Sequence, residues 1–214
     1  MKLVEMSVEQ ICAELGSESP APGGGSAAAL AGAIAASLCA MVSRLTTGRE
    51  RFRDAWGEMQ EVRAESERLG TRLRQLVDED ADAFRSVMAA RRLPKSSDAE
   101  RSAREGAVQE ATLRSARVPL ETLVSLARLS ALALAAARKG NPGCLTDVGS
   151  AAQLIRAGAV AASYNVRVNL PSLADTAVRD QLSAETSRAL AEARAAIGRI
   201  EGAVESGLGD RSGI

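Results

Sequence analysis

Apolar residues recur at intervals of three and four along most of the chain, the spacing that gives an α-helix one apolar face. Few stretches show the alternation or the β-branched clusters that are typical of strands. Six helices are predicted, at about 7–15, 25–45, 51–91, 97–139, 150–169 and 175–205. The pattern therefore predicts an all-α fold, an antiparallel up-and-down bundle of about six helices in a single domain.

Three features mark the boundaries of the middle helices. The third helix is expected to end at Leu93, because the residue before a proline is pushed away from helical geometry. Ser97 and Glu100 have the spacing of a capping box, which opens the fourth helix. Pro119 lies inside that helix and predicts either a kink or a division into two shorter helices.

Composition narrows the class of protein. The chain has 214 residues, which fits one domain spanning residues 1–214. Lysine plus arginine and aspartate plus glutamate number 27 each, so a nucleic-acid partner is not expected. Three widely spaced cysteines and no histidine argue against a metal site and favour reduced thiols in a cytoplasmic protein. The N-terminus reaches Glu5 before any apolar run, so no signal peptide is expected.

Eighteen uncharged residues, 26–43, reach the length of a membrane span. They are alanine, glycine and serine more often than leucine or phenylalanine, which disfavours insertion into lipid. A central bundle helix, whose small side chains let neighbouring backbones approach, explains the run better. We expect no membrane partner.

One carboxylate occupies an apolar position. Asp80 lies on the helical stripe that carries Leu73, Leu76 and Phe84, whereas Asp78 and Asp82 share a polar face. An unpaired buried charge costs several kcal/mol, so such a group is paired, hydrogen-bonded or facing a cavity, often with a shifted pKa. Asp80 is the catalytic candidate. The alternatives are a structural pair with an arginine, or a stripe end that reaches solvent.

The absence of histidine strengthens this candidate. Proton transfer near neutral pH then depends on a carboxylate, lysine, tyrosine, cysteine or water. A buried carboxylate with a raised pKa is a suitable acid and base, and mechanisms with a histidine-activated nucleophile are excluded.

A glycine turn precedes the small-residue helix. Glycines allow positive φ and close backbone approach, and a helix N-terminus offers free N–H groups to an anion. Predicted substrate-binding residues here are Pro22, Gly23, Gly24, Gly25 and Ser26, the last as helix cap or ligand donor. The alternative is a plain inter-helix turn.

A second loop repeats the arrangement before another small-residue helix. Asn141, Thr146 and Asp147 are predicted to bind substrate, with Asp147 as a simple N-cap the alternative. Downstream, Asn165 and Asn169 lie four residues apart on one helix face. They are suited either to reading a heterocycle or to pairing helices.

Five segments together carry a resemblance that spans essentially the whole chain. In chain order they are PAPGGGSAAALAG, VDEDADAF, RRLPK, GNPGCLTDVG and YNVRVNLPSLAD. The sequence resembles the cyclodeaminase/cyclohydrolase family of tetrahydrofolate enzymes. This resemblance implies an all-α fold, a homodimer or an assembly of dimers, and a folate substrate with no further cofactor. The family's catalytic aspartate matches Asp80.

Two positions depart from the family pattern. Family members often carry lysine after Thr-x-Gly, where this chain has Arg49, a cation suited to a folate glutamate tail. The asparagine that commonly follows Asn-Pro is Gly143, which removes any side-chain role there. Lys95 matches the pattern and is a second candidate for carboxylate binding, with a surface lysine as the alternative.

Two activities occur in the resembled family. Methenyltetrahydrofolate cyclohydrolase, which opens the methenyl bridge to 10-formyltetrahydrofolate, is our first hypothesis, favoured by the stand-alone length. Formiminotetrahydrofolate cyclodeaminase, which releases ammonia, is the second. A non-catalytic folate-binding or structural bundle is the third.

Overall fold

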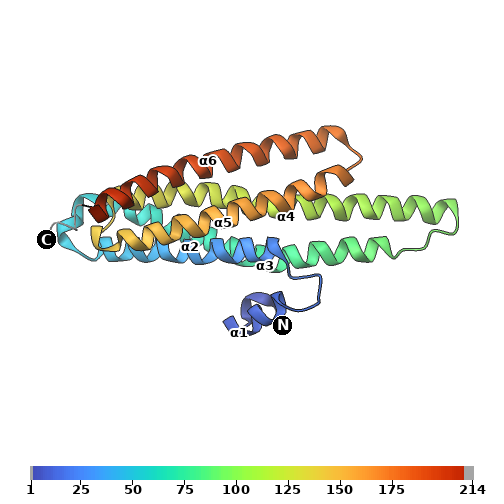
Figure 1. Cartoon of the computed structure of the whole chain (residues 1–214), viewed down its shortest axis with the longest axis horizontal. Coiled ribbons are helices and arrows are strands. Elements are labelled where there is room, and N and C mark those ends of the chain that lie inside the picture. The colour runs from blue at the N-terminus through green and yellow to red at the C-terminus, as the bar shows by residue number, and fades with distance from the viewer. Residues whose placement is uncertain (1, 210–214) are drawn as a thin grey trace.

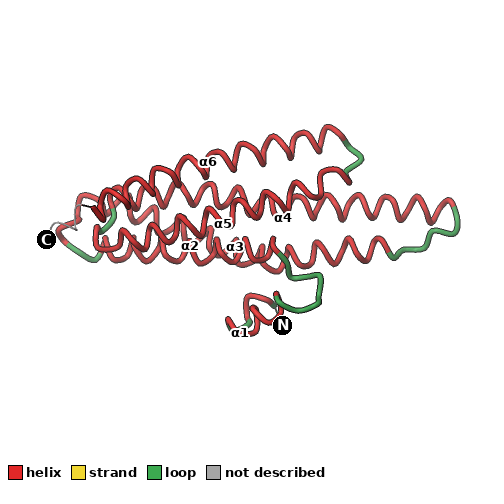
Figure 2. The backbone as a smooth tube through the Cα atoms, viewed as in Figure 1, coloured by secondary structure: helices red, strands yellow, loops and turns green. Residues whose placement is uncertain are grey.

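The computed structural model describes residues 2–209, and in these residues it contains helices and no strand. The α-helices are α1 (Val8–Leu15), α2 (Gly24–Thr47), α3 (Trp56–Arg91), α4 (Asp98–Lys139), α5 (Leu145–Asn169) and α6 (Thr176–Gly209). Short 3-10 turns lie at Leu3–Glu5, Glu50–Ala55, Pro142–Cys144 and Leu170–Ser172. The five long helices run alternately in opposite directions (Figures 1 and 2), which confirms the predicted all-α antiparallel bundle.

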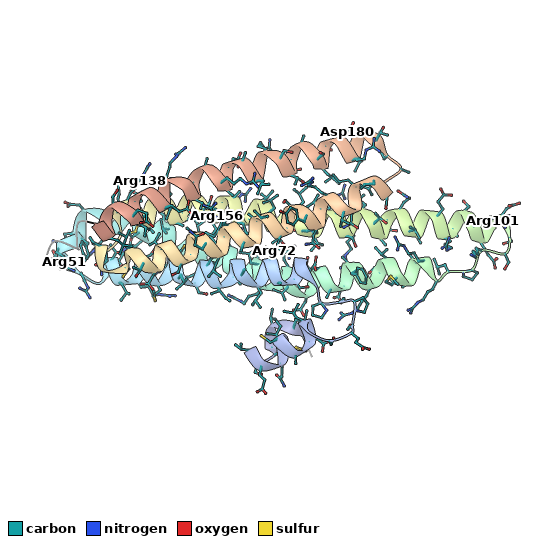
Figure 3. All side chains as sticks on the ribbon, in the orientation of Figure 1. Arg51, Arg72, Arg101, Arg138, Arg156 and Asp180 are labelled. Carbon is teal, nitrogen blue, oxygen red and sulfur yellow. The ribbon has the colours of Figure 1, made fainter. Side chains whose placement is uncertain are left out.

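Small residues set the spacing of the core. Helix α2 packs on α3 and α5, while α4 packs on α3, α5 and α6. A Cβ atom on Gly32 would lie 2.7 Å from Leu126, and one on Gly158 would lie 2.9 Å from the carbonyl of Ala28. The helix backbones therefore approach α2 closely. Charged side chains line the outside of the bundle (Figure 3).

Two helices, α2 and α4, are long and apolar enough to cross a membrane by length and composition alone. In each of them, 61% of the most apolar window is buried inside the bundle. Packing within the protein therefore accounts for most of this apolar surface.

The helix ends agree with the sequence at two places and differ at two others. Ser7 and Ser97 form capping boxes, the second as predicted. Helix α2 has Gly23 as its N-cap, so Ser26 lies inside the first turn and is not the cap. Helix α5 begins at Leu145, earlier than expected, so the alternative of Asp147 as N-cap is wrong.

Helix α4 continues through Pro119, so the alternative of two shorter helices is wrong. A proline has no N–H group, and it leaves the carbonyl four residues earlier without its helical donor. That carbonyl belongs to Ser115, and Nδ2 of Asn169 donates to it at 3.1 Å. A side chain from α5 therefore satisfies the acceptor that Pro119 leaves open.

Helix α1 lies outside the bundle, beside the start of α2 (Figure 1). The N-terminal segment is held by Asp78, whose Oδ1 accepts a hydrogen bond from the backbone N–H of Leu3 at 2.6 Å. Asp78 therefore anchors the N-terminus to α3.

Candidate functional site

Helix lengths determine where the glycine turn lies. Helix α2 has 24 residues and α3 has 36, and the two are antiparallel with a short connection at one end. The first turn of α2 therefore lies beside the middle of α3, where Asp80 is. The structure brings the glycine turn and Asp80, two elements of the predicted site, into direct contact.

The contact between α2 and Asp80 is close. The hydroxyl of Ser26 donates to Oδ2 of Asp80 at 3.1 Å. A Cβ atom on Gly25 would lie 2.1 Å from Oδ1 of Asp80 and 2.5 Å from its Cγ. Glycine is required at position 25 because any side chain there would displace the carboxylate.

Backbone conformation is not the reason for these glycines. None of the glycines in the described part of the chain has positive φ, so that part of the prediction is wrong. Pro22 is buried and follows Ala21 through a cis peptide bond. Close approach to Asp80 explains Gly25, while Gly24 lies against Asn165.

Asp80 is half-buried, and burial raises the pKa of its carboxyl group. Hydrogen bonding by the hydroxyl and the backbone amide of Ser26 lowers the pKa in part. Among the described residues no arginine or lysine forms an ion pair with Asp80, so the alternative of a structural arginine pair is wrong. Asp80 is therefore a desolvated carboxylate with one serine as its partner.

The helix N-terminus holds this carboxylate itself. The first turn of a helix carries free N–H groups and the positive end of the dipole, which attract an anion. Here Ser26 directs its hydrogen-bond donors to Asp80. The anion that the glycine turn holds in this structure is thus a protein side chain.

The two asparagines of α5 differ in what they contact. Nδ2 of Asn165 donates to the carbonyl of Ala161 at 2.9 Å and lies 3.4 Å from the position of a Cβ on Gly24. Asn165 therefore lies against the glycine turn. Nδ2 of Asn169 donates to the carbonyl of Ser115 on α4 and, at 2.8 Å, to the carbonyl of Asn165 within α5, so one of these hydrogen bonds joins the two helices.

The second loop lies at the opposite end of α2. The backbone N–H of Asn141 donates to Oγ1 of Thr46 at 2.8 Å, next to the C-terminus of α2. Arg49 follows α2, and both Arg49 and Asp147 act on the pKa of Cys144, which burial raises. Thr146 lies in the first turn of α5 and is exposed.

These predicted residues therefore form two clusters within one chain. The 24 residues of α2 separate them by about 35 Å at the usual helical rise. Arg49, Asn141, Thr146 and Asp147 cannot reach Asp80 in the same subunit. Lys95 is also apart, exposed on the loop between α3 and α4, about 20 Å along α3 from Asp80.

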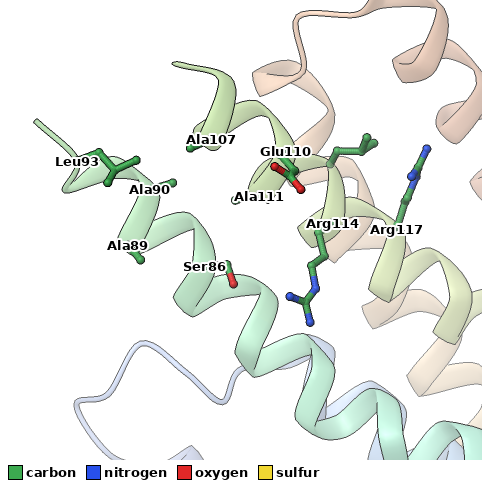
Figure 4. A pocket seen from close by; sticks show the side chains of 10 residues that line it. Ser86, Ala89, Ala90, Leu93, Ala107, Glu110, Ala111, Arg114 and Arg117 are labelled. Atoms are coloured by element: carbon green, nitrogen blue, oxygen red, sulfur yellow. The ribbon is translucent and has the colours of Figure 1, made fainter. Parts of the chain in front are cut away.

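Two cavities lie on either side of the outer half of α3. One, of about 230 Å³, is next to the glycine turn and is lined by Ser19, Pro20, Ala21, Phe84, Arg85, Met88, Ala89 and Arg92. The other, of about 640 Å³, lies between α3 and α4 and includes Arg114 and Arg117 (Figure 4). Sequence reasoning missed the first cavity, although Phe84, Met88 and Arg92 follow Asp80 at four-residue intervals.

The fold and site define a class: an all-α bundle with a desolvated carboxylate on a glycine turn. No group of three or more His, Cys, Asp or Glu residues within 2–209 is placed to hold a metal ion. The family model described as formiminotransferase-cyclodeaminase matches residues 7–188. The chain belongs to the formiminotransferase-cyclodeaminase family, as the five segments indicated.

Three known proteins illustrate the similarity. Methenyltetrahydrofolate cyclohydrolase from Methylorubrum extorquens is 36% identical over 200 residues, covering 94% of this chain and 96% of the relative. Formimidoyltransferase-cyclodeaminase from Rattus norvegicus is 32% identical over 95% of this chain, which spans only 38% of the rat protein. The crystal structure of formiminotetrahydrofolate cyclodeaminase from Thermotoga maritima has a TM-score of 0.87, 26% identity, and coverage of 96% of this chain and 98% of that one.

Proposed function

We propose that this protein is a methenyltetrahydrofolate cyclohydrolase that uses Asp80 as its acid and base. The observation that carries the proposal is the close contact of Asp80 with Gly25 and Ser26. It occurs in a chain whose similarity to a cyclohydrolase extends over nearly the full length of both proteins. The reaction adds water to 5,10-methenyltetrahydrofolate and gives 10-formyltetrahydrofolate.

The chemistry suits a desolvated carboxylate. The methenyl bridge is a delocalised cation, and a nearby negative charge stabilises it more strongly where water is excluded. As water adds to the bridging carbon, Asp80 accepts one of its protons and returns it to the ring nitrogen as that carbon–nitrogen bond breaks. The remaining hydroxyl proton is released to solvent as the formyl C=O forms. The raised pKa makes Asp80 a stronger base than an exposed aspartate.

Cyclodeamination is the second candidate, favoured by the similarity to the rat and Thermotoga maritima proteins. The ring-closing nitrogen would attack the formimino carbon, and Asp80 would protonate the departing ammonia. Both reactions pass through one tetrahedral carbon, so the same carboxylate suits either.

Ultraviolet absorbance of 5,10-methenyltetrahydrofolate separates the two activities. We expect purified protein to consume this compound faster than buffer does. With 5-formiminotetrahydrofolate, a rise in the same absorbance together with ammonia release would instead favour the cyclodeaminase. No change with either compound would contradict both and favour a binding protein.

We further propose that the protein works as a homodimer formed through α2. This helix has a partly exposed apolar face of Leu30, Ile34, Leu38, Met41 and Leu45. A cavity of about 500 Å³ separates part of this face from the N-terminal segment. A second copy of α2 has the apolar chemistry to cover such a surface.

The positions on this face suit an antiparallel pair. A twofold axis near Ser37 and Leu38 sets Leu30 opposite Leu45 and Ile34 opposite Met41 of the partner. The same axis sets Ser26 opposite Arg49. The partner subunit's Arg49 would then lie beside the glycine turn and Asp80, which joins the two clusters that one chain keeps apart.

Hybrid dimers test this arrangement. The Asp80→Asn and Arg49→Gln proteins should each lose nearly all activity alone. Mixed subunits should recover about a quarter of wild-type activity, because half of the dimers are hybrids and one of the two sites in each hybrid is intact. No recovery despite subunit exchange, or a monomer by light scattering, would contradict the shared site. As a control, the Asp80→Asn/Arg49→Gln double variant should give no active site in a hybrid with wild type.

A further inference from the structure

The groove beside the glycine turn extends away from Asp80 along α3. Its walls are Ser19, Pro20 and Ala21, which immediately precede the glycine turn, on one side and α3 on the other. On α3, Phe84, Met88 and Arg92 lie at successive four-residue steps beyond Asp80. Each step advances about 6 Å along the helix, so the α3 wall of the groove runs about 12 Å from Phe84 to Arg92, and Phe84 lies about one helical turn beyond Asp80.

The near part of the groove is suited to an aromatic ring. Phe84 is one of only four aromatic residues in the chain, and 38% of its surface is exposed. Pro20 and Met88 provide further apolar surface in the same groove. A flat ligand ring packs well on an exposed phenyl ring and a thioether.

The far part is suited to a carboxylate. Arg85 is paired with Asp82 at 2.9 Å, whereas the Arg92 guanidinium makes no ion pair or hydrogen bond with the described residues. Residues 84–117 contain eight lysines or arginines and four acidic residues, although the whole chain is neutral. A free guanidinium in a positive region binds a carboxylate in a two-pronged geometry.

The larger cavity on the other side of α3 fits less well. Its walls come from α3 and α4, and it includes Glu110 beside Arg114 and Arg117 (Figure 4). Its lining includes none of the residues Ser19, Pro20 and Ala21 that lead into the glycine turn. Of these two cavities, only the smaller one combines residues next to the glycine turn with the unpaired Arg92.

We propose that this groove is the subsite for the aryl-glutamate tail of the substrate. The ring of the p-aminobenzoyl group lies on Phe84 and the glutamate carboxylate binds Arg92, while the reacting carbon faces Asp80. This inference rests on the proposed folate function, since it assigns the tail of that substrate. Lys95 follows Arg92 at the tip and is positioned for a further glutamate.

The test compares Arg92→Gln with a matched control, Arg91→Gln, which removes the same charge from the same hairpin outside the groove. Two substrates are used: 5,10-methenyltetrahydrofolate and 5,10-methenyltetrahydropteroate, which lacks the glutamate. We expect Arg92→Gln to lower kcat/KM for 5,10-methenyltetrahydrofolate by about 10- to 100-fold, mainly by raising KM. The same variant should change kcat/KM for 5,10-methenyltetrahydropteroate by less than about twofold. Phe84→Ala should weaken the binding of both substrates, because both carry the p-aminobenzoyl ring.

Equal loss on both substrates, or equal behaviour of the two arginine variants, would overturn the subsite. A direct binding measurement keeps this result separate from the catalytic proposal. Wild-type protein should bind p-aminobenzoylglutamate more tightly than p-aminobenzoate, and Arg92→Gln should abolish that preference. If the wild type turns over no folate yet shows the preference, the reaction is wrong and the subsite stands; if the preference is absent, the subsite is wrong.

Discussion

Replacement of Asp80 with asparagine should lower turnover of the folate substrate by about 10³-fold, within the range for losing a general base. Asparagine has nearly the same shape and can still accept the hydrogen bond from Ser26, but it cannot take a proton. The fold should persist, since the substitution removes a desolvated charge. The measurement is the absorbance assay together with thermal unfolding of both proteins.

The pH dependence of kcat provides a second readout of Asp80. Burial raises its pKa, so the ionised, active form is lost as pH falls through a value above the usual carboxyl range. This fall of kcat at low pH should be absent from the residual activity of Asp80→Asn. Asp180→Asn, an exposed change on α6, is the control and should leave both rate and profile unchanged. An Asp80→Asn enzyme with wild-type kcat would refute the proposed mechanism.

Substitution of Gly25 with alanine should lower activity by about 10²-fold or more, although the alanine side chain is only one methyl group, because catalytic geometry tolerates little displacement. The new Cβ would lie 2.1 Å from Oδ1 of Asp80, so the carboxylate must rotate away and lose its bond to Ser26. The free energy of unfolding should change little, because alanine favours the helix by about 1 kcal/mol over glycine and this gain offsets part of the cost of the clash.

Gly198→Ala on α6 is the matched control. A Cβ atom at Gly198 meets nothing within 4 Å, so the change should raise stability by about 1 kcal/mol and leave kcat unchanged. If Gly25→Ala retained full activity, the close contact between Asp80 and the first turn of α2 would not matter for the reaction.

Helix positions were predictable because their signals are local. The three- and four-residue spacing and the Ser97–Glu100 capping box place the helices within a few residues. Asp80 was also recognisable, since a charged residue on an apolar stripe is visible without knowing what packs against it. The start of α5 was misplaced because Thr146 and Asp147 are typical of a cap, yet Cys144 occupies that position.

Phe84 shows where helical periodicity fails. It lies on the same stripe as Leu73 and Leu76, which are buried, but Phe84 is exposed. Helix α2 begins beside Asp80, so no part of α2 covers α3 beyond that point. The periodic pattern identifies a face, but the length of the neighbouring helix decides how much of that face is covered.

The amino-acid sequence by itself determined the helices, their apolar faces and the carboxylate on one of them, because these depend on residues close in the chain. Only the tertiary structure decided that Gly25 and Ser26 hold Asp80, that Asn169 satisfies the carbonyl left open by Pro119, and that Arg49 lies at the far end of α2. Contacts between helices depend on their relative lengths and packing, which no local spacing encodes.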